Sequence, residues 1–155
     1  MENELNRLDT LLQDSRRRAF LHVNNTFDRD MQYYLQYMDM RREQYAILCR
    51  ISDNIRRLTQ LPRQAYVVAN FMRLLSYSVH EHNNATGLIR ELEVIRSHFR
   101  SGDLPASREE FEARAILYEI VFELRQLLRK KQAFAAALTP SQIRTFWEMD
   151  SQPNK

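Results

Sequence analysis

The fold is decided by residues 107–138, which read SREEFEARAILYEIVFELRQLLRKKQAFAAAL without a glycine or a proline. Gly102 and Pro105 precede this stretch and Pro140 follows it, so the residues that disfavour helix interiors stand outside its two ends. We therefore expect one helix over Ser107–Leu138, about eight turns long. A helix of this kind is stabilised mainly by packing against partners, so the rest of the chain should supply them.

The ends of this stretch carry side chains that suit a helix of this polarity. Ser107 can cap the free amides of the first turn while Glu110 reaches back to the Ser107 amide, which is the capping-box pattern. Arg129, Lys130 and Lys131 put positive charge near the other end, where the helix dipole is negative. The local sequence thus predicts both the start and the direction of the helix.

Apolar residues inside the stretch recur at alternating spacings of three and four, which predicts one buried face. The members of this face are Phe111, Ala115, Tyr118, Val121 or Phe122, Leu124, Leu128, Ala135 and Leu138.

Composition extends the helical prediction to the whole chain. The 155 residues include only 2 glycines and 4 prolines, while 44% are hydrophobic and 28% are charged. Such a chain favours few, long helices and no sheet. We expect an all-α fold: an antiparallel helical bundle of five to six helices, two or three of them long, in a single domain over residues 1–149, with a frayed tail at 150–155.

Four further helices and a short terminal one are expected, over Glu2–Val23, Phe27–Leu58, Arg63–His82, Ala85–Arg100 and the residues after Thr139. Between the first two, Thr26 or Asp28 could cap a new helix, or the chain could continue with a kink. Gly102 is placed for a left-handed residue at a helix end. Thr139 and Gln142 form a second capping-box pattern around Pro140.

Charge and cysteine content narrow the class of protein. The net charge is +3, and arginines are spread among acidic residues along every predicted helix, which argues against a nucleic-acid-binding face. Cys49 is the single cysteine, so no internal disulfide is possible, which suits a reducing compartment. The apolar neighbours of Cys49 predict that its thiol is buried. No apolar run is long enough to span a bilayer, and Met1–Glu4 does not resemble a secretion signal, so we expect a cytoplasmic chain.

Catalytic patterns are missing from the sequence. None of the 4 histidines has a glutamate three residues before it, so the paired Glu-x-x-His motif of di-iron bundles cannot form. No glycine-rich phosphate loop and no nucleophile motif can be assigned. We expect no enzyme, no metal and no cofactor.

Two groups of side chains are candidates for contact with a ligand or partner. In the first interpretation they are ordinary helix surface, with arginines in solvent and tyrosine rings buried. In the second they form a pocket or docking face for an anion or a partner. The candidates are Tyr37, Arg41, Arg42 and Tyr45 in one segment and Arg108, Glu112 and Arg114 in the other.

Residues 104–115, LPASREEFEARA, closely resemble the signature LP-x-[TS]-REEFE-x-RA of the C-terminal domain of putative aromatic acid exporters, which are bacterial membrane proteins of the fusaric-acid-resistance type. Tyr34–Leu48, Glu81–Leu92 and Lys131–Phe134 match that domain in the same order, so the resemblance extends over Phe27–Trp147.

The resemblance implies a cytoplasmic domain that follows a membrane-spanning half and is attached through it to the inner membrane. Residues 1–23 would then be a juxtamembrane helix, with Arg16, Arg17 and Arg18 on the cytoplasmic side as the positive-inside rule requires. The domain's own role would be regulation, oligomerisation or gating, without transport by itself. Its partners would be the membrane-spanning half of the same protein and, if apolar surface is left uncovered, a second copy.

Two further hypotheses stay open at this point. Arg41, Arg42, Arg108 and Arg114, with Tyr37 or Tyr45, could bind an aromatic carboxylate through guanidinium pairing and ring stacking. Alternatively, the chain could be a free-standing helical module for binding a protein or a nucleic acid.

Overall fold

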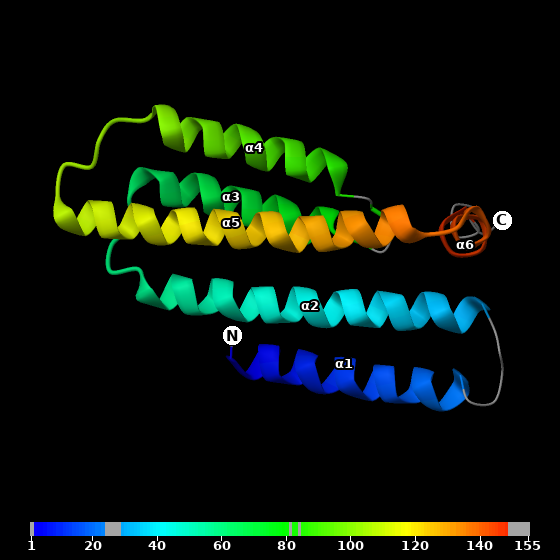
Figure 1. Ribbon diagram of the computed structural model, residues 1–155. Coiled ribbons are helices and arrows are strands. Elements are labelled where there is room, and N and C mark those ends of the chain that lie inside the picture. Colours follow the sequence, from blue (N-terminus) through cyan, green and yellow to red (C-terminus); the bar gives the residue numbers. More distant parts are fainter. Residues whose placement is uncertain (1, 24–28, 81, 84, 149–155) are drawn as a thin grey trace, which may run out of the picture. The chain divides into compact units, whose positions relative to one another are not determined.

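The computed structural model describes residues 2–23, 29–80, 82–83 and 85–148, and within these ranges the chain is helical with no strand (Figure 1). The all-α prediction is therefore confirmed. The predicted break at 24–26, its caps Thr26 and Asp28, and the tail at 150–155 lie outside the described residues. The helices are α1 (Glu2–Val23), α2 (Arg29–Arg57), α3 (Arg63–Ser78), α4 (Thr86–Ser101), α5 (Arg108–Ala137), α6 (Pro140–Gln142) and the π-helix η1 (Ile143–Glu148).

Helix α3 ends at Ser78, four residues before the predicted end at His82. The side-chain amide of Asn83 donates to the Ser78 carbonyl oxygen at 2.7 Å, and its oxygen accepts from the Ala85 backbone N–H at 2.6 Å. Asparagine thus offers the backbone partners that compete with further helical hydrogen bonds. This polar turn ends α3 early and leads into α4.

The left-handed residue next to α4 is not the predicted glycine. Gly102, expected in that conformation after α4, has φ −76° and ψ 164°, which is extended backbone. Ala85, at the other end of the helix, has φ 62° and is the non-glycine residue with positive φ in the described chain. The short hydrogen bond from its N–H to Asn83 holds this less favourable conformation.

The chain forms two compact units, and the long helices α2 and α5 each contribute to both. The first unit comprises residues 1–45 and 133–155, and the second comprises residues 46–132. Each unit has its own group of buried apolar side chains.

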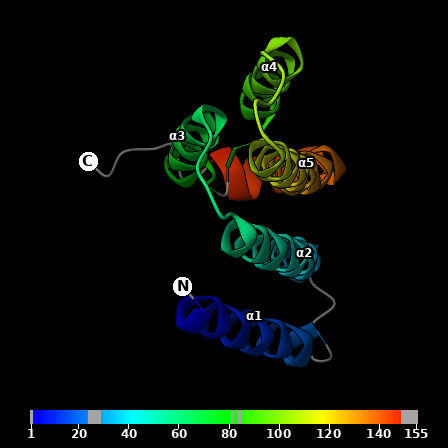
Figure 2. The ribbon, with the colours of Figure 1, turned by 90° about the vertical axis from the view of Figure 1, so that its left-hand side faces the viewer.

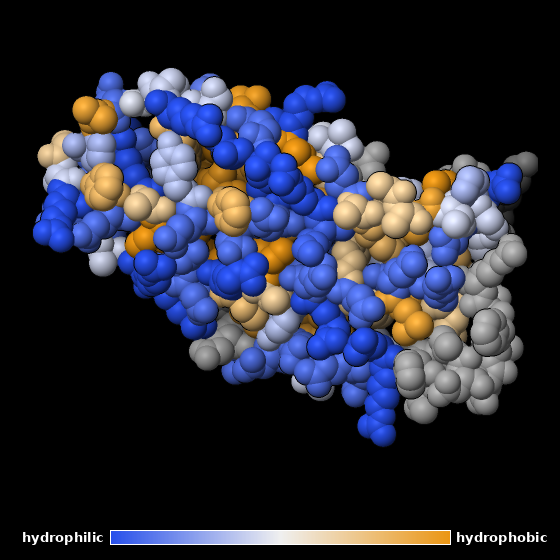
Figure 3. Space-filling view, in the orientation of Figure 1, coloured by the Kyte–Doolittle hydropathy of each residue, from blue (hydrophilic) through white to orange (hydrophobic). Residues whose placement is uncertain are grey.

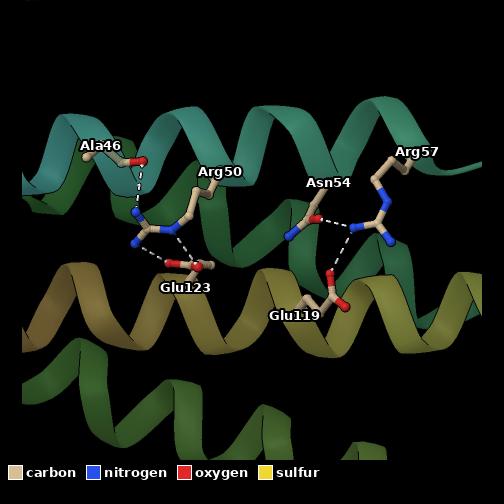
Figure 4. A network of polar contacts seen from close by, with 6 residues as sticks. All are labelled: Ala46, Arg50, Asn54, Arg57, Glu119 and Glu123. Carbon is tan, nitrogen blue, oxygen red and sulfur yellow. Dashed lines mark hydrogen bonds and ion pairs between the residues drawn. The ribbon is translucent and has the colours of Figure 1, made fainter.

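In the second unit α3, α4 and α5 lie side by side in both ribbon views (Figures 1 and 2), and the final part of α2 lies beside α5 in Figure 4. Leu92 of α4 and Leu124 and Leu128 of α5 are at most 1% exposed. The other core residues of this unit are Ile47, Ile51, Val68, Phe71, Leu75, Ala85, Leu88, Ile95, Leu117, Ile120, Val121 and Leu127.

The buried face of α5 differs from the predicted one along the first half of the helix. Ala113, Leu117 and Ile120 are buried there, whereas Phe111 and Tyr118 are 60% and 41% exposed. Ala115 is also exposed. The prediction was therefore wrong at Phe111, Ala115 and Tyr118 and correct at the C-terminal members Leu124, Leu128 and Leu138. The sequence carries two apolar stripes on this part of α5, and the core uses the aliphatic one.

The first unit contains α1 alongside the first part of α2 (Figures 1 and 2) and an aromatic core. The rings of Tyr33 and Phe146 stack with centroids 4.0 Å apart, and the Trp147 indole N–H donates to the Tyr33 hydroxyl at 3.3 Å. Met40, Phe134 and Leu138 complete the buried set. This core fixes η1 against α2 and the end of α5.

The predicted second capping box is confirmed. The Gln142 N–H donates to the Thr139 hydroxyl at 3.2 Å, and the Thr139 N–H donates to the Gln142 side-chain oxygen at 2.9 Å. Pro140 occupies the first turn, where its missing N–H costs nothing.

The charged triplet near the end of α5 does not act on the helix dipole as predicted. Helix α5 continues to Ala137 and has no basic residue in its last turn. The dipole effect is confined to that turn, so Arg129, Lys130 and Lys131 lie too far back. Lys131 is instead completely buried.

Candidate functional site

The start of α5 carries the family-like signature and is fixed by local polar contacts. The Glu110 N–H donates to the Ser107 hydroxyl at 3.1 Å, as a capping residue requires. The Glu110 carboxylate accepts from the Ala106 N–H at 2.8 Å, one residue earlier than the predicted contact with the Ser107 amide. The Arg114 guanidinium donates to the Glu110 carboxylate and to the Asp103 carbonyl oxygen. Arg114 therefore joins the loop to the helix.

Hydrogen bonds shift the acidity of the two glutamates at this start. The Ala106 N–H, followed by Arg114, lowers the pKa of the Glu110 carboxyl group. The pKa of Glu109 is lowered by its own backbone N–H and then by Ser107. Both carboxylates are thus held in the charged form that suits a helix N-terminus.

Arg108 and Glu112, the other candidates on α5, pair with each other at 3.1 Å. Their side chains are 86% and 60% exposed, so this is a surface ion pair of small energetic weight. It leaves both groups accessible to a partner.

Arg41 of α2 is committed to its neighbours. Its Nε and one terminal nitrogen donate to the Tyr37 hydroxyl at 2.9 and 2.8 Å, and its other terminal nitrogen donates to the Gln44 side-chain oxygen at 3.1 Å. The Tyr37 ring in turn contacts Phe134 edge-on, with centroids 5.6 Å apart. Arg41 and Tyr37 therefore serve the first unit's core, and Tyr45 is half-buried.

Arg42 differs from these candidates because it lines a hollow. The hollow lies in the first unit, between α1 and α2, and has a volume of about 730 Å³. Arg16 and Asp39 form an ion pair at 2.9 Å in its wall. The described residues that line it are Gln13, Arg16, Arg17, Leu35, Asp39 and Arg42.

The predicted candidates thus fall into separate local groups. Tyr37 and Arg41 form one contact group, Arg42 belongs to the hollow, and Arg108 pairs with Glu112. Tyr37, Arg41 and Arg42 belong to the first unit. The Arg108–Glu112 pair belongs to the second unit. A shared pocket made by all of them stays a prediction.

A second set of polar contacts, which was not predicted, joins α2 to α5 within the second unit (Figure 4). Arg50 binds both carboxylate oxygens of Glu123, at 2.7 and 2.8 Å, and this contact raises the pKa of the guanidinium. Arg57 donates to Asn54 at 2.9 Å and to Glu119 at 3.2 Å. The only sequence signal was spacing, since Glu119 and Glu123 are one helical turn apart.

Exposed aromatic side chains mark one face of α5. Phe111, Tyr118 and Phe122 are 60%, 41% and 53% exposed, and their spacing with Ala115 puts all four on one face. We call these four residues the aromatic row. Figure 3 shows orange and tan side chains interrupting the blue surface over α5. The Tyr118 ring also contacts Phe99 of α4, with centroids 5.3 Å apart.

The described residues contain no cluster of three or more potential metal ligands. His80 and His82, predicted to lie within a helix, follow the end of α3, with ring centroids 6.4 Å apart.

Cys49, predicted to be buried, is half-buried and not in a disulfide. Across the part of the chain that the structure describes, no helix combines the length and apolar character needed to cross a bilayer.

Fold and surface together define an all-α helical-bundle domain with a charged, ion-paired surface. Comparison with known families assigns it further. The family described as "Putative aromatic acid exporter C-terminal domain" matches residues 1–132, and the chain belongs to this family. The resemblance to this family is thereby confirmed for residues 1–132, while 133–147 lie outside the matched residues. The family is associated with export and is not a known enzyme family.

Two relatives are informative. "Uncharacterized protein YqjA" of Bacillus subtilis (strain 168) is 31% identical over 124 residues, which cover 80% of this chain and 38% of that protein. The chain thus spans about two fifths of the length of this curated relative. A crystal structure described as a putative membrane protein from Clostridium difficile 630 is 28% identical, with a TM-score of 0.77 over 87% of this chain and 80% of that one.

Proposed function

We propose that this chain is the cytoplasmic C-terminal domain of a membrane exporter of aromatic carboxylates, and that it regulates or gates the membrane-spanning half without transporting anything itself. The family match over residues 1–132 carries this proposal. The longer relative supports it, because most of that protein lies outside the aligned region and offers room for a membrane-spanning half. That half of the same protein would be the main partner and would attach the domain to the inner membrane.

The surface supports a contact role. The exposed Arg108–Glu112 pair lies at the start of α5, inside the stretch 104–115 that resembles the family's signature. A pair that is more than half exposed contributes little to folding, so its side chains can exchange partners at small cost.

The aromatic row offers a surface for a homodimer, which we keep as part of the proposal. Large apolar side chains that stay exposed in one row are typical of interaction surfaces. A second copy would cover the row by packing the same helical face against itself, as two-fold dimers do.

The alternative of a nucleic-acid-binding module receives less support. Many arginines of the described residues pair with carboxylates and so offer less charge to phosphates. Besides the exposed Arg108–Glu112 pair, such pairs include Arg16–Asp39, Arg50–Glu123, Arg57–Glu119, Arg96–Glu93, Arg114–Glu110 and Arg125–Glu93.

Deletion in the parent protein tests the regulatory role. Cells loaded with radiolabelled 4-hydroxybenzoate would express the parent protein with or without residues 1–155, at matched amounts in the membrane. We expect efflux to persist after deletion but to lose its normal dependence on the internal concentration, because the gate is gone. A substitution of Arg108 to Gln, in the full-length parent, is the milder variant and should change this dependence partially.

Two results would contradict the proposal. Identical efflux curves with and without the domain would remove a regulatory role, and a parent gene that encodes no membrane-spanning segment would remove the exporter itself.

A further inference from the structure

The hollow between α1 and α2 carries an excess of positive charge. Among the described lining residues, Arg16, Arg17 and Arg42 contribute guanidinium groups and Asp39 contributes a carboxylate. Arg16 pairs with Asp39 at 2.9 Å, which neutralises one of the three. Within the described residues Arg17 and Arg42 have no carboxylate partner, so these two guanidinium groups are the ones that an anionic ligand would contact.

Its size and remaining lining suit a small organic molecule. The volume of about 730 Å³ lies within the range of about 300–1,000 Å³ that is usual for small-molecule sites. Gln13 adds an amide that can donate and accept hydrogen bonds, and Leu35 adds an apolar contact. The aliphatic parts of the arginine side chains extend the apolar surface.

Two guanidinium groups favour a ligand with two anionic groups. A guanidinium group binds a carboxylate through two parallel hydrogen bonds, a geometry that the compact ammonium group of lysine cannot provide. A monocarboxylate would satisfy either Arg17 or Arg42 and leave the other positive charge unpaired. A dicarboxylate would satisfy both.

We propose that the hollow lined by Arg17 and Arg42 is a binding site for a small organic dianion, an aromatic dicarboxylate in the first instance. The two guanidinium groups come from α1 and α2 of the first unit. The aromatic character and the regulatory meaning rest on the proposed function. Arg16 and Asp39 form the wall of the site, and Asp39 limits its charge to that of a dianion.

The position of this site differs from the one expected from sequence. Of the four arginines first considered for a carboxylate, Arg41 and Arg114 are occupied by neighbours and Arg108 pairs with Glu112. Arg42 is the one that faces a hollow, and its companion comes from α1.

Isothermal titration calorimetry on the 155-residue chain tests the proposal. The probes are the three isomeric benzenedicarboxylates, which share a charge but separate their carboxylates differently, with benzoate as the monoanionic control and inorganic phosphate as a non-organic one. We expect at least one dicarboxylate to bind about tenfold or more tightly than benzoate, and to weaken as salt is raised.

Substitutions identify the site. Arg17→Gln and Arg42→Gln should each weaken that binding by about tenfold or more, because each removes a charged hydrogen-bond donor. Arg108→Gln is the matched control and should leave it unchanged, since Arg108 pairs with Glu112 elsewhere. Circular dichroism of each variant checks that the exposed substitution leaves the helices intact.

The outcomes separate this inference from the proposed function. No binding of any dicarboxylate, binding that Arg17→Gln and Arg42→Gln leave unchanged, or binding of phosphate alone would overturn the organic-dianion site. Site-specific binding supports it whatever the efflux assay shows. Regulated efflux that persists after Arg17→Gln and Arg42→Gln would leave the proposed function standing without this site in it.

Discussion

Glu110 connects the loop before α5 to the helix itself. Its carboxylate accepts from the Ala106 N–H at 2.8 Å and from Arg114, which also binds the Asp103 carbonyl oxygen. These contacts need the charged carboxylate, and they lower its pKa in the folded chain. The contribution to stability is therefore present above the unfolded pKa and is lost as pH falls through the lower folded pKa.

The pKa of the Glu110 carboxyl group can be measured by a carbon-detected NMR titration. We expect it to lie below the ordinary glutamate value of 4.5. Arg114→Gln should raise this pKa only part of the way, because the larger cause is the Ala106 N–H, which the substitution leaves in place. Arg108→Gln serves as control and should leave Glu110 unchanged. A Glu110 pKa at or above 4.5 in the unsubstituted chain would contradict the arrangement.

Residue-scale features with local causes were predictable from sequence. The capping box of Thr139 and Gln142 was correct because both partners lie within one turn. The role of Glu110 was correct in kind but displaced to the Ala106 amide, since the exact donor depends on how the preceding loop approaches. The left-handed conformation of Ala85 was missed, because alanine gives no signal for it and only the Asn83 contact holds it.

Among the helices, α2 and α5 are held in register by Arg50 and Glu123. This pair has two parallel hydrogen bonds, at 2.7 and 2.8 Å, and the Glu123 side chain is only 15% exposed. The neighbouring pair of Arg57 and Glu119 has a single contact at 3.2 Å, and both side chains are more than half exposed. Geometry and burial both favour the first pair.

Double-mutant cycles in urea should rank these pairs. We expect a coupling free energy of about 1 kcal/mol between Arg50 and Glu123, using Arg50→Gln and Glu123→Gln. The matched cycle with Arg57→Gln and Glu119→Gln should give about 0.3 kcal/mol or less, because solvent screens that pair. Equal coupling in the two cycles would show that the bidentate geometry does not persist in solution.

The faces of the helices show where sequence patterns become ambiguous. On α5 two sets of apolar residues repeat with the helical period, one containing Phe111 and Tyr118 and the other Leu117 and Leu124. Their spacings therefore predict a buried face equally well. Only packing against α3 and α4 decides between them. The Arg50–Glu123 contact was missed for the same reason, since it joins residues 73 positions apart.

For the whole molecule, the continuity of α2 and α5 through both compact units bears on the proposal of a single domain over 1–149. A helix shared by two units loses packing in both when either one opens, so their unfolding should be coupled. The chain has one tryptophan, Trp147, which lies in the aromatic core of the first unit. Its fluorescence therefore reports on that unit, whereas far-ultraviolet circular dichroism reports on all helices.

Urea unfolding followed by both signals should give coincident transitions. Separate midpoints would contradict the single domain and show that the units unfold independently.

The same titration at two protein concentrations tests the proposed homodimer, because association shifts the midpoint upward with concentration. Phe122→Glu, on the aromatic row, should abolish that shift while leaving the core side of α5 untouched. A midpoint that does not depend on concentration would count against the dimer.

At this scale the sequence predicted the helical class and the family, since composition and a local signature carry them. It did not predict the two units, because their division falls inside the two longest helices, where no glycine or proline marks it.

The single cysteine lies on the other side of that division. Cys49 belongs to the second unit and Trp147 to the first, and the chain has one residue of each type. A thiol-attached acceptor on half-buried Cys49 would make an energy-transfer pair with the indole without any substitution. The efficiency of energy transfer between Trp147 and the acceptor on Cys49 can then be measured while an organic dianion is titrated into the hollow of the first unit.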